Sequence, residues 1–382
     1  MKFIHTSDWH IGRLFHNVSL LDEQLQVLEQ LKDFAKHHAI DALVVAGDIF
    51  DRSVPPAEAI YALNKFLNDI TQELKIPIIM ISGNHDSAKR LGFGANHMKG
   101  SNLHILSNLH DIDKPIIVQT KKGEIHFFGI PYHEPVEVAE TFQCEVKTFD
   151  EANRYLIERI SQVRQSSIPT VLISHCFVEN ADVSDSERSL SIGGADRVSL
   201  EPFESFDYVA LGHLHSPQHK SAVHIRYSGS LLKYSFSEHQ QKKGVTLVEL
   251  NEKGFVNSQH LDLKPKRDVR ILEGLLVDLI EQGKTDTKYD DYLLVRLTDT
   301  HDLLEPMARL REVYPNVLQI ERPNFAISNG SQLIFNSENK RDEAQTFRDF
   351  FTQVMSKELT PQQNDFLLNI IRKAQTASEN NL

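Results

Sequence analysis

The stretch MKFIHTSDWHIG, residues 1–12, decides the fold of this chain. Its first half has the apolar residues of a buried strand, and the stretch ends in the polar pair Asp8 and His10. Side chains two residues apart on a strand point to the same face, so we expect this carboxylate and imidazole to face one spot. A buried strand that ends in two side chains able to bind metal predicts a functional site at that end of a sheet.

The bulk composition limits the possible functions. The chain has 382 residues with 41 Lys plus Arg and 53 Asp plus Glu, a formal charge of −12. This acidity argues against non-specific nucleic-acid binding by the whole surface, although it allows a local basic patch. Cys144 and Cys176 are too few for a disulfide framework. No signal peptide and no apolar run of the roughly 20 residues needed by a membrane helix is visible, so we expect a cytoplasmic protein without a membrane partner.

Helix and strand patterns alternate over about residues 1–250. Residues 20–38 carry Leu21, Leu25, Leu28 and Leu31 at helical spacing, and residues 57–74 predict a second helix. Short apolar runs predict buried strands at residues 41–48, 76–82, 170–175 and 207–212. Strands alternating with helices favour an α/β fold of layered sheets.

Polar side chains with metal-binding atoms follow these strands. They are Asp8, His10, Asp48, Asn84, His175, His213 and His215. Ligand sites of α/β sheets form at the carboxyl ends of the strands, where loops converge. Seven oxygen and nitrogen ligands are too many for one first-row ion and suit two ions that share a bridging carboxylate; the mixture favours manganese, iron or zinc over calcium. Two ions roughly 3.5–4 Å apart are typical of phosphoryl transfer.

Each fragment alone is common by chance, but the ordered set resembles a known family. The fragments of this set are DxH at 8–10, GDxxDR at 47–52, GNHD at 83–86, His175 and GHxH at 212–215. Together they are similar to the signature of the calcineurin-like metallophosphoesterase superfamily. Within it, SDWHIG, GDIFDRSVPP and SGNHDS resemble the SbcD family, the nuclease subunits of bacterial SbcCD complexes. The resemblance implies a metallophosphoesterase β-sandwich flanked by helices, which we expect over residues 1–263.

The resemblance also implies a role for each residue of the set. Asp48 would bridge the two ions. Asp8, His10 and His215 would complete one site, and Asn84, His175 and His213 would complete the other. His85 would stabilise the transition state or protonate the leaving oxygen, and the Asp51 carboxylate would orient His85. The family implies Mn²⁺ as the working metal, which ligand chemistry alone does not select over iron or zinc.

Basic residues near the metal loops are candidates for DNA contacts. They are Arg13, Lys89, Arg90 and Arg188. Phosphate contacts position DNA without reading its sequence; solvated surface charge is the equally weighted alternative for the first three. Arg188 belongs to a long polar stretch, residues 177–199, that we interpret as either functional or disordered. Residues 191–196 would line the DNA channel in the functional case.

The last third of the chain predicts further modules. Residues 264–325 read strand, helix, strand, helix, strand, a small α+β unit that resembles the family's capping, DNA-binding domain. Residues 326–340 predict a linker. Residues 341–376 predict two amphipathic helices, the second begun by Thr360 and Pro361. On the residues alone, these helices dock equally well on the capping unit or on a partner. The family resemblance favours the coiled-coil base of SbcC, an SMC-like ATPase.

These observations predict a two-metal DNA nuclease. The resemblance implies 3′–5′ exonuclease activity on duplex ends and endonuclease activity on single strands and hairpins, in DNA end processing, repair and recombination. It also implies a homodimer within a heterotetramer with SbcC, associated with the nucleoid. Residues 57–70 and 86–99 would form the dimer contact, although core packing explains their apolar faces equally well. The chain has no P-loop, so ATP hydrolysis would belong to the partner.

Two other classes of function use the same fold. One is a phosphoesterase for small substrates with the same two-metal site, against which the capping unit and the terminal helices argue. The other is a scaffold that keeps the fold without chemistry. Such scaffolds usually lose metal ligands, whereas all seven ligand positions and His85 are filled here.

Overall fold

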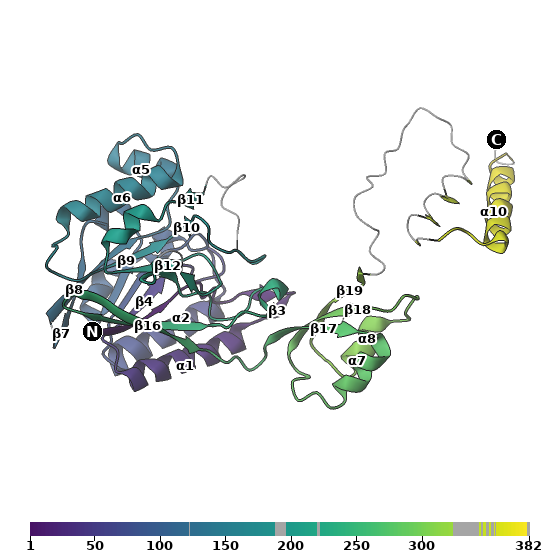
Figure 1. The fold of residues 1–382 in the computed structure, drawn as a ribbon, viewed down its shortest axis with the longest axis horizontal. Coiled ribbons are helices and arrows are strands. Elements are labelled where there is room, and N and C mark those ends of the chain that lie inside the picture. Colours follow the sequence, from purple (N-terminus) through teal and green to yellow (C-terminus); the bar gives the residue numbers. More distant parts are fainter. Residues whose placement is uncertain are drawn as a thin grey trace. The chain divides into compact units, whose positions relative to one another are not determined.

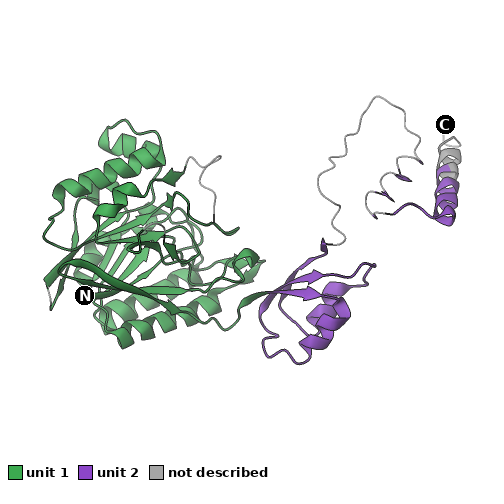
Figure 2. Cartoon of the chain, in the orientation of Figure 1, with its two compact units in different colours: residues 1–270 green, residues 271–382 purple. Residues whose placement is uncertain are grey.

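The computed structural model of the chain describes residues 1–121, 123–187, 196–219, 222–323, 344, 347–348, 351–352, 355 and 357–379. The chain divides into two compact units, residues 1–270 and 271–382 (Figure 2). The predicted boundaries at 263, 325 and 340 remain predictions.

The first unit is built around two six-stranded sheets (Figure 1). The first sheet has the order β16-β15-β1-β4-β5-β6, with bounds Gly254–Asp262, Gly244–Asn251, Lys2–Thr6, Ala42–Ala46, Ile78–Ile81 and Leu103–Leu106. Strands β1, β4, β5 and β6 are parallel, and β15 pairs antiparallel with β1 and β16. Every residue of β4 is buried, which explains its unbroken apolar sequence.

The second sheet has the order β13-β14-β12-β9-β8-β7. Their bounds are Gln218–His219, Ile225–Tyr227, Tyr208–Gly212, Thr170–His175, Gly123–Ile130 and Ile116–Thr120. Strands β8, β9, β12 and β14 are parallel. The carboxyl ends of β9 and β12 therefore lie together, as do those of β1, β4 and β5 in the first sheet.

Apolar layers join these elements into a sandwich. Between the sheets, the Phe3 ring meets the rings of Phe127 and Tyr208 edge-on, with centroids 5.6 Å and 5.4 Å apart. Helices α5 (Pro135–Phe142) and α6 (Phe149–Val163) cover the outer face of the second sheet, where Leu156 of α6 and Leu172 of β9 belong to the same buried cluster. Figure 1 shows α1 (Leu21–His38) and α6 on opposite sides of the sandwich. The predicted α/β sandwich flanked by helices is confirmed.

The buried face of α1 differs from the predicted leucine stripe. The helix buries Gln24, Val27, Leu28 and Leu31, whereas the Leu25 side chain is 37% exposed. Both sets follow the spacing of three and four residues that shares a helix face, but the buried face is the one that carries positions 24, 27, 28 and 31, and position 25 lies at its edge. The true stripe therefore includes a polar residue, Gln24.

The second unit begins with the small α+β module. Its elements follow the predicted order: β17 (Val269–Gly274), α7 (Leu276–Gly283), β18 (Tyr292–Leu297), α8 (Pro306–Arg311) and β19 (Val317–Glu321). The sheet order is β17-β18-β19, and β17 begins just before the boundary between the units. Leu293, Val295, Leu310 and Tyr314 are fully buried in its core.

The terminal helix α10 (Pro361–Glu379) begins where its capping residues predict. Thr360 Oγ1 accepts a hydrogen bond from the Gln363 amide at 3.3 Å, and Gln363 Oε1 accepts one from the Thr360 amide at 2.9 Å. The predicted linker at 326–340 lies outside the described residues, as does most of the predicted helix before α10.

A buried histidine links the two sheets. In β1, His5 Nδ1 lies 3.0 Å from the Tyr208 hydroxyl and Nε2 lies 3.1 Å from the Leu211 carbonyl oxygen. Burial, with a smaller contribution from the Arg226 charge, lowers the pKa of His5 to about 3. The unfolded chain takes up a proton here near pH 6.5, but the folded chain does not until about pH 3. His5 therefore removes stability as the pH falls below about 6.5.

We expect His5→Gln to flatten the pH dependence of the free energy of unfolding. Between pH 6.5 and 5 the slope should fall by up to ~1.4 kcal/mol per pH unit, the value for one proton. Urea unfolding in chelator at stepped pH measures this slope. His219→Gln on β13, where the side chain is exposed, is the matched control for loss of a histidine outside the core. An unaltered slope in His5→Gln would contradict the argument.

Candidate metal centre

The loops at the carboxyl ends of five strands bring the predicted site together. Asp8 and His10 follow β1, Asp48 follows β4, and Asn84 and His85 follow β5. His175 ends β9, and His213 and His215 follow β12. The first sheet thus supplies two carboxylates, an amide and two imidazoles, and the second sheet supplies three imidazoles. All are buried except Asn84 and His85, which are half-buried.

Backbone conformation, rather than strand alternation, aims the first two ligands. The prediction that Asp8 and His10 share a strand face is wrong, because β1 ends at Thr6 and neither residue belongs to a strand. Their side chains nevertheless lie in one site. Their φ angles are +52° and +45°, and Asp48 also has a positive φ of +51°. Residues other than glycine rarely adopt this region. Hydrogen bonds from the Asp8 amide to the Gly47 carbonyl (3.1 Å) and from the His10 amide to the Asp48 carbonyl (3.0 Å) hold it in place.

At two motif positions only glycine fits, because neighbouring atoms lie too close for a Cβ atom. A Cβ atom at Gly212 would lie 1.8 Å from the Ala46 carbonyl oxygen, where β12 of one sheet meets β4 of the other. A Cβ atom at Gly83 would lie 2.1 Å from Asp48 Oδ1. The glycines of GNH and GH therefore let both sheets and both carboxyl-end loops reach one spot.

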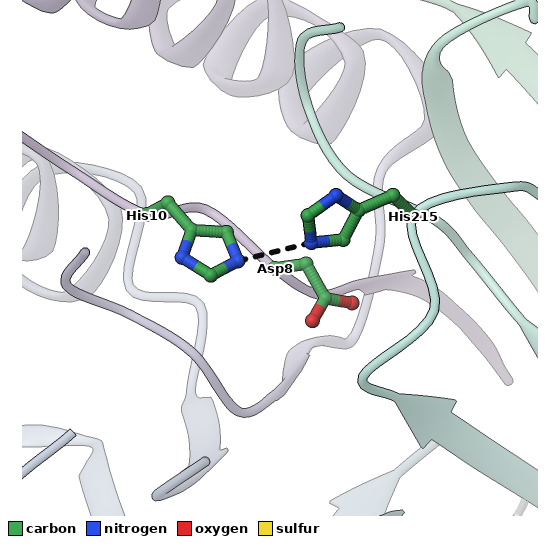
Figure 3. Close-up of side chains that lie close together, drawn as sticks. All are labelled: Asp8, His10 and His215. Atoms are coloured by element: carbon green, nitrogen blue, oxygen red, sulfur yellow. Dashed lines mark hydrogen bonds between the residues drawn. The ribbon is translucent and has the colours of Figure 1, made fainter. Parts of the chain in front are cut away.

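The first group of donors consists of Asp8, His10 and His215 (Figure 3). His10 Nε2 lies 3.1 Å from His215 Nε2, the dashed contact in Figure 3. One potential ligand atom from each of the three residues lies within 4.8 Å of the others. Asp48 Oδ2 is 3.6 Å from His10 Nε2, at the side of this group.

The second group consists of Asn84, His175 and His213. Asn84 Oδ1 lies 3.0 Å from His175 Nε2 and 3.2 Å from His213 Nδ1. Asp48 Oδ2 is 3.5 Å from His175 Nε2. The same carboxylate oxygen therefore lies beside both groups.

The protonation states suit cations. Burial, together with neighbouring imidazoles, lowers the pKa of His10 and His213, and burial lowers the pKa of His175, so these rings are neutral and present lone pairs. Burial and the Asp48 charge raise the pKa of Asp8. Asp8 and Asp48 are adjacent buried carboxylates beside these neutral rings, and this donor set fits divalent cations.

Hydrogen bonds at the remote ring nitrogens orient two of the imidazoles. His175 Nδ1 donates to the Ala46 carbonyl oxygen at 2.9 Å, and His215 Nδ1 lies 2.6 Å from Ser186 Oγ. Such bonds fix the tautomer and leave the other nitrogen free for a metal. Among the described residues His10 Nδ1 has no hydrogen-bond partner; Asp51 Oδ1 lies 3.7 Å away.

His85 contacts Asp51, but not through the predicted carboxylate. His85 Nδ1 lies 2.8 Å from the Asp51 main-chain carbonyl oxygen, and the His85 amide donates to Asp48 Oδ1 at 2.9 Å. The Asp51 carboxylate instead pairs with Arg13 at 3.1 Å. Because the Asp51 carboxylate is paired with the Arg13 guanidinium, the Asp51 main-chain carbonyl is the group that holds the His85 imidazole.

The basic candidates lie in different surroundings. The Arg13 guanidinium is partly buried, paired with Asp51 and 4.9 Å above the Tyr234 ring. Lys89 and Arg90 are exposed on the short helix α3 (Ala88–Leu91). Arg188 and residues 191–195 lie outside the described residues. Contacts of these side chains with DNA remain predictions.

Sequence reasoning missed two supporting residues. Gln24 donates from Nε2 to the carbonyls of Trp9 (3.1 Å) and His10 (2.8 Å), and its Oε1 accepts the Gly12 amide at 3.0 Å. The signal in the sequence was the helical spacing, which puts the Gln24 side chain on the same buried helix face as Leu28 and Leu31. The second is Glu238, fully buried behind His215 and paired with Lys243, and no pattern in the sequence marks it.

Comparison with known proteins identifies the family. Residues 1–217 match the calcineurin-like phosphoesterases, and residues 265–355 match the type 5 capsule protein repressor C-terminal domain, SbcD_C. The SbcD subunit of nuclease SbcCD from Staphylococcus epidermidis is 33% identical over 372 residues, which are 97% of this chain and 98% of that protein. The chain belongs to the SbcD nuclease family. Its first unit is a metallophosphoesterase, and the predicted enzyme class is confirmed.

The similar solved structures are more distant in sequence. TT1561 of Thermus thermophilus is 14% identical with a TM-score of 0.42, covering 69% of this chain and 99% of that chain. A dimetal phosphatase from Danio rerio is 13% identical with a TM-score of 0.37, covering 69% and 99%. Within the described part of the chain, no helix is long and apolar enough to cross a membrane.

Gln24→Leu tests the support of the first metal loop. The substitution leaves the His10 carbonyl and the Gly12 amide buried without this partner, so we expect the free energy of unfolding to fall by about 2–4 kcal/mol. Urea unfolding in chelator measures the loss. Gln26→Leu, exposed on the same helix, should change the stability by less than about 0.5 kcal/mol. Equal effects of the two substitutions would contradict this role for Gln24.

Proposed function

We propose that the chain is a DNA nuclease that hydrolyses phosphodiesters with two divalent cations. One observation carries the proposal: Asp48 Oδ2 lies 3.6 Å from His10 Nε2 and 3.5 Å from His175 Nε2, between two groups of donors. Asp48 would bridge the cations. Asp8, His10 and His215 would hold one cation, and Asn84, His175 and His213 would hold the other. The mixed donors suit Mn²⁺, as the family resemblance implies.

The chain's own residues prepare the reaction. When bound, the cations would supply an activated water and neutralise charge on the phosphate. His85 is the proposed acid. Because its Nδ1 is held by the Asp51 carbonyl at 2.8 Å, Nε2 is the atom left to exchange a proton with the leaving oxygen. The bond from the His85 amide to Asp48 Oδ1 keeps this ring beside the proposed bridging carboxylate.

DNA is the proposed substrate, as duplex ends for 3′–5′ exonuclease action and as single strands and hairpins for endonuclease action. The match of residues 265–355 to SbcD_C favours this substrate over small phosphoesters, because a small substrate needs no such appended domain. Lys89 and Arg90 are exposed after the GNHD loop and would contact phosphates. Arg13 and Arg188 remain further candidates.

The surface of α10 supports a partner. A hollow of about 590 Å³ is lined by apolar side chains that include Phe347, Phe351, Phe366 and Ile370, and Phe366 is 66% exposed. An amphipathic helix with an open apolar face suits helical docking. We assign this surface to the coiled-coil base of an SbcC-type ATPase, which would control access of duplex DNA to the site.

Exposed apolar side chains in the first unit support a homodimer within that complex. On α2 (Ala57–Asn68), Ile60 and Tyr61 are 50% and 73% exposed, and Phe93 is 85% exposed. Exposed apolar groups mark interaction sites where they form a contiguous patch, which we propose for these residues in the dimer. A nuclease that processes DNA ends in repair and recombination would work in the cytoplasm, at the nucleoid.

Cleavage of a hairpin-ended duplex tests the activity. With Mn²⁺ we expect cleavage that chelator abolishes and that Asp48→Ala removes. His85→Ala should lower the rate about 10²–10⁴-fold, the usual contribution of a general acid, while bound Mn²⁺ is retained. His37→Ala, exposed on α1, is the control. Turnover of small phosphoesters without DNA cleavage would place the site in the other substrate class.

Binding of the SbcC-type ATPase tests the α10 surface. Phe366→Glu puts a charge into the hollow, and we expect affinity for the coiled-coil base to fall at least about 30-fold, as at an interface hot spot. Asn369→Glu adds the same charge to α10 at a residue that does not line the hollow, and should leave affinity within about threefold. Calorimetric titration measures both. Similar losses in both variants would point to charge alone.

A further inference from the structure

A chain of hydrogen bonds runs from the interior of the first unit to His215. Lys243 Nζ lies 2.5 Å from Glu238 Oε2, and both side chains are buried. Ser186 Oγ contacts Glu238 Oε1 and lies 2.6 Å from His215 Nδ1. His215 Nε2, on the other side of the ring, faces His10 Nε2 at 3.1 Å.

The chemistry of these groups gives each bond one direction. The Lys243 ammonium can only donate, so Glu238 beside it is an acceptor. Ser186 has one hydroxyl proton and gives it to Glu238, which leaves the Ser186 lone pairs to accept from His215 Nδ1–H. The proton of His215 is thereby held on Nδ1. Nε2 is left with a lone pair toward Asp8 and His10.

The corresponding bond in the second donor group is built differently. His175 Nδ1 donates to the main-chain oxygen of Ala46, the last residue of β4. Ser186 instead lies on a segment without helix or strand, which we define as residues 184–187. Side chains hold this segment: Glu187 Oε1 accepts the His215 amide at 2.7 Å, and Ser237 Oγ accepts the Asp185 amide at 3.1 Å. One imidazole is oriented by a sheet and the other by a loop.

We propose that Ser186 is a positioning residue for the cation site of Asp8, His10 and His215, and that its hydroxyl sets the affinity of this site independently of the other. The inference rests on the proposed two-cation site. Loss of the Ser186 hydroxyl removes the 2.6 Å contact at His215 Nδ1 and leaves Glu238 Oε1, at 3.5 Å, as the more distant acceptor, so the ring and its tautomer are held less tightly. Loss of such an outer partner typically weakens metal binding about 10–100-fold. Only one of the two cations is affected.

Titration of the full chain with Mn²⁺ alone tests this, with free Mn²⁺ counted by electron paramagnetic resonance. Asn84→Ala leaves the site that contains His215, and Asp8→Ala leaves the other site. Ser186→Ala should weaken Mn²⁺ binding about 10–100-fold in the Asn84→Ala background and less than about twofold in the Asp8→Ala background. Ser186→Thr keeps the hydroxyl and should restore the affinity. Equal losses in both backgrounds, or no rescue by threonine, would overturn the proposal.

Matched controls separate positioning from folding. Ser184 Oγ contacts Ser186 Oγ at 3.0 Å and Glu238 Oε1 at 3.3 Å, and its hydroxyl makes no bond to His215. Ser184→Ala should therefore leave both affinities within about twofold. The unfolding midpoint of Ser186→Ala in chelator should match that of the unsubstituted chain. If Ser186→Ala does not fold, Ser186→Cys replaces it in the test, because a thiol forms only a weak hydrogen bond. An unchanged Mn²⁺ affinity of Ser186→Cys in the Asn84→Ala background would then overturn the proposal.

Failure of the two proposals gives different results. Fewer than two Mn²⁺ bound by the unsubstituted chain would overturn the two-cation site and this inference with it. Two Mn²⁺ bound, with affinity unchanged by Ser186→Ala in the Asn84→Ala background, would overturn the role of Ser186 alone.

Discussion

Main-chain pairing between the loops that follow β1 and β4 is the constraint on which the site depends. The pairing continues past the ends of the strands, from Asp8 to Gly47, His10 to Asp48 and Ile11 to Ile49, at 3.0–3.1 Å. It holds Asp8, His10 and Asp48 in a backbone conformation that these residues rarely adopt. Their side chains then converge without being part of a regular strand.

The interior of the sandwich determines the chemistry of the converging groups. Burial lowers the pKa of His10, His175 and His213, which keeps these rings neutral, and it makes two neighbouring carboxylates costly without positive charge. In water the same residues would be ordinary solvated groups. The apolar sheets therefore do more than carry the ligands, because burial between them gives the donor set a charge and protonation that fit divalent cations.

The sequence predicts much of this arrangement. The order of strands and helices, the seven converging donors and His85 follow from apolar runs that end in polar motifs. The bridging position of Asp48 was implied by family resemblance, and its oxygen does lie beside both donor groups. The missed features depend on atoms or partners that no local pattern specifies. Asp51 uses its carbonyl instead of its carboxylate, and Glu238 reaches His215 from another part of the chain.

The close approach of Gly212 to Ala46 has a consequence for how the first unit comes apart. β12 and β4 belong to different sheets, and the donors beyond this point come from both. Cations shared between these donors would fasten one sheet to the other at their carboxyl ends. Separation of the sheets would then require release of the ions. With metal bound, the two sheets would unfold together in one cooperative transition; without metal, their unfolding would be less cooperative.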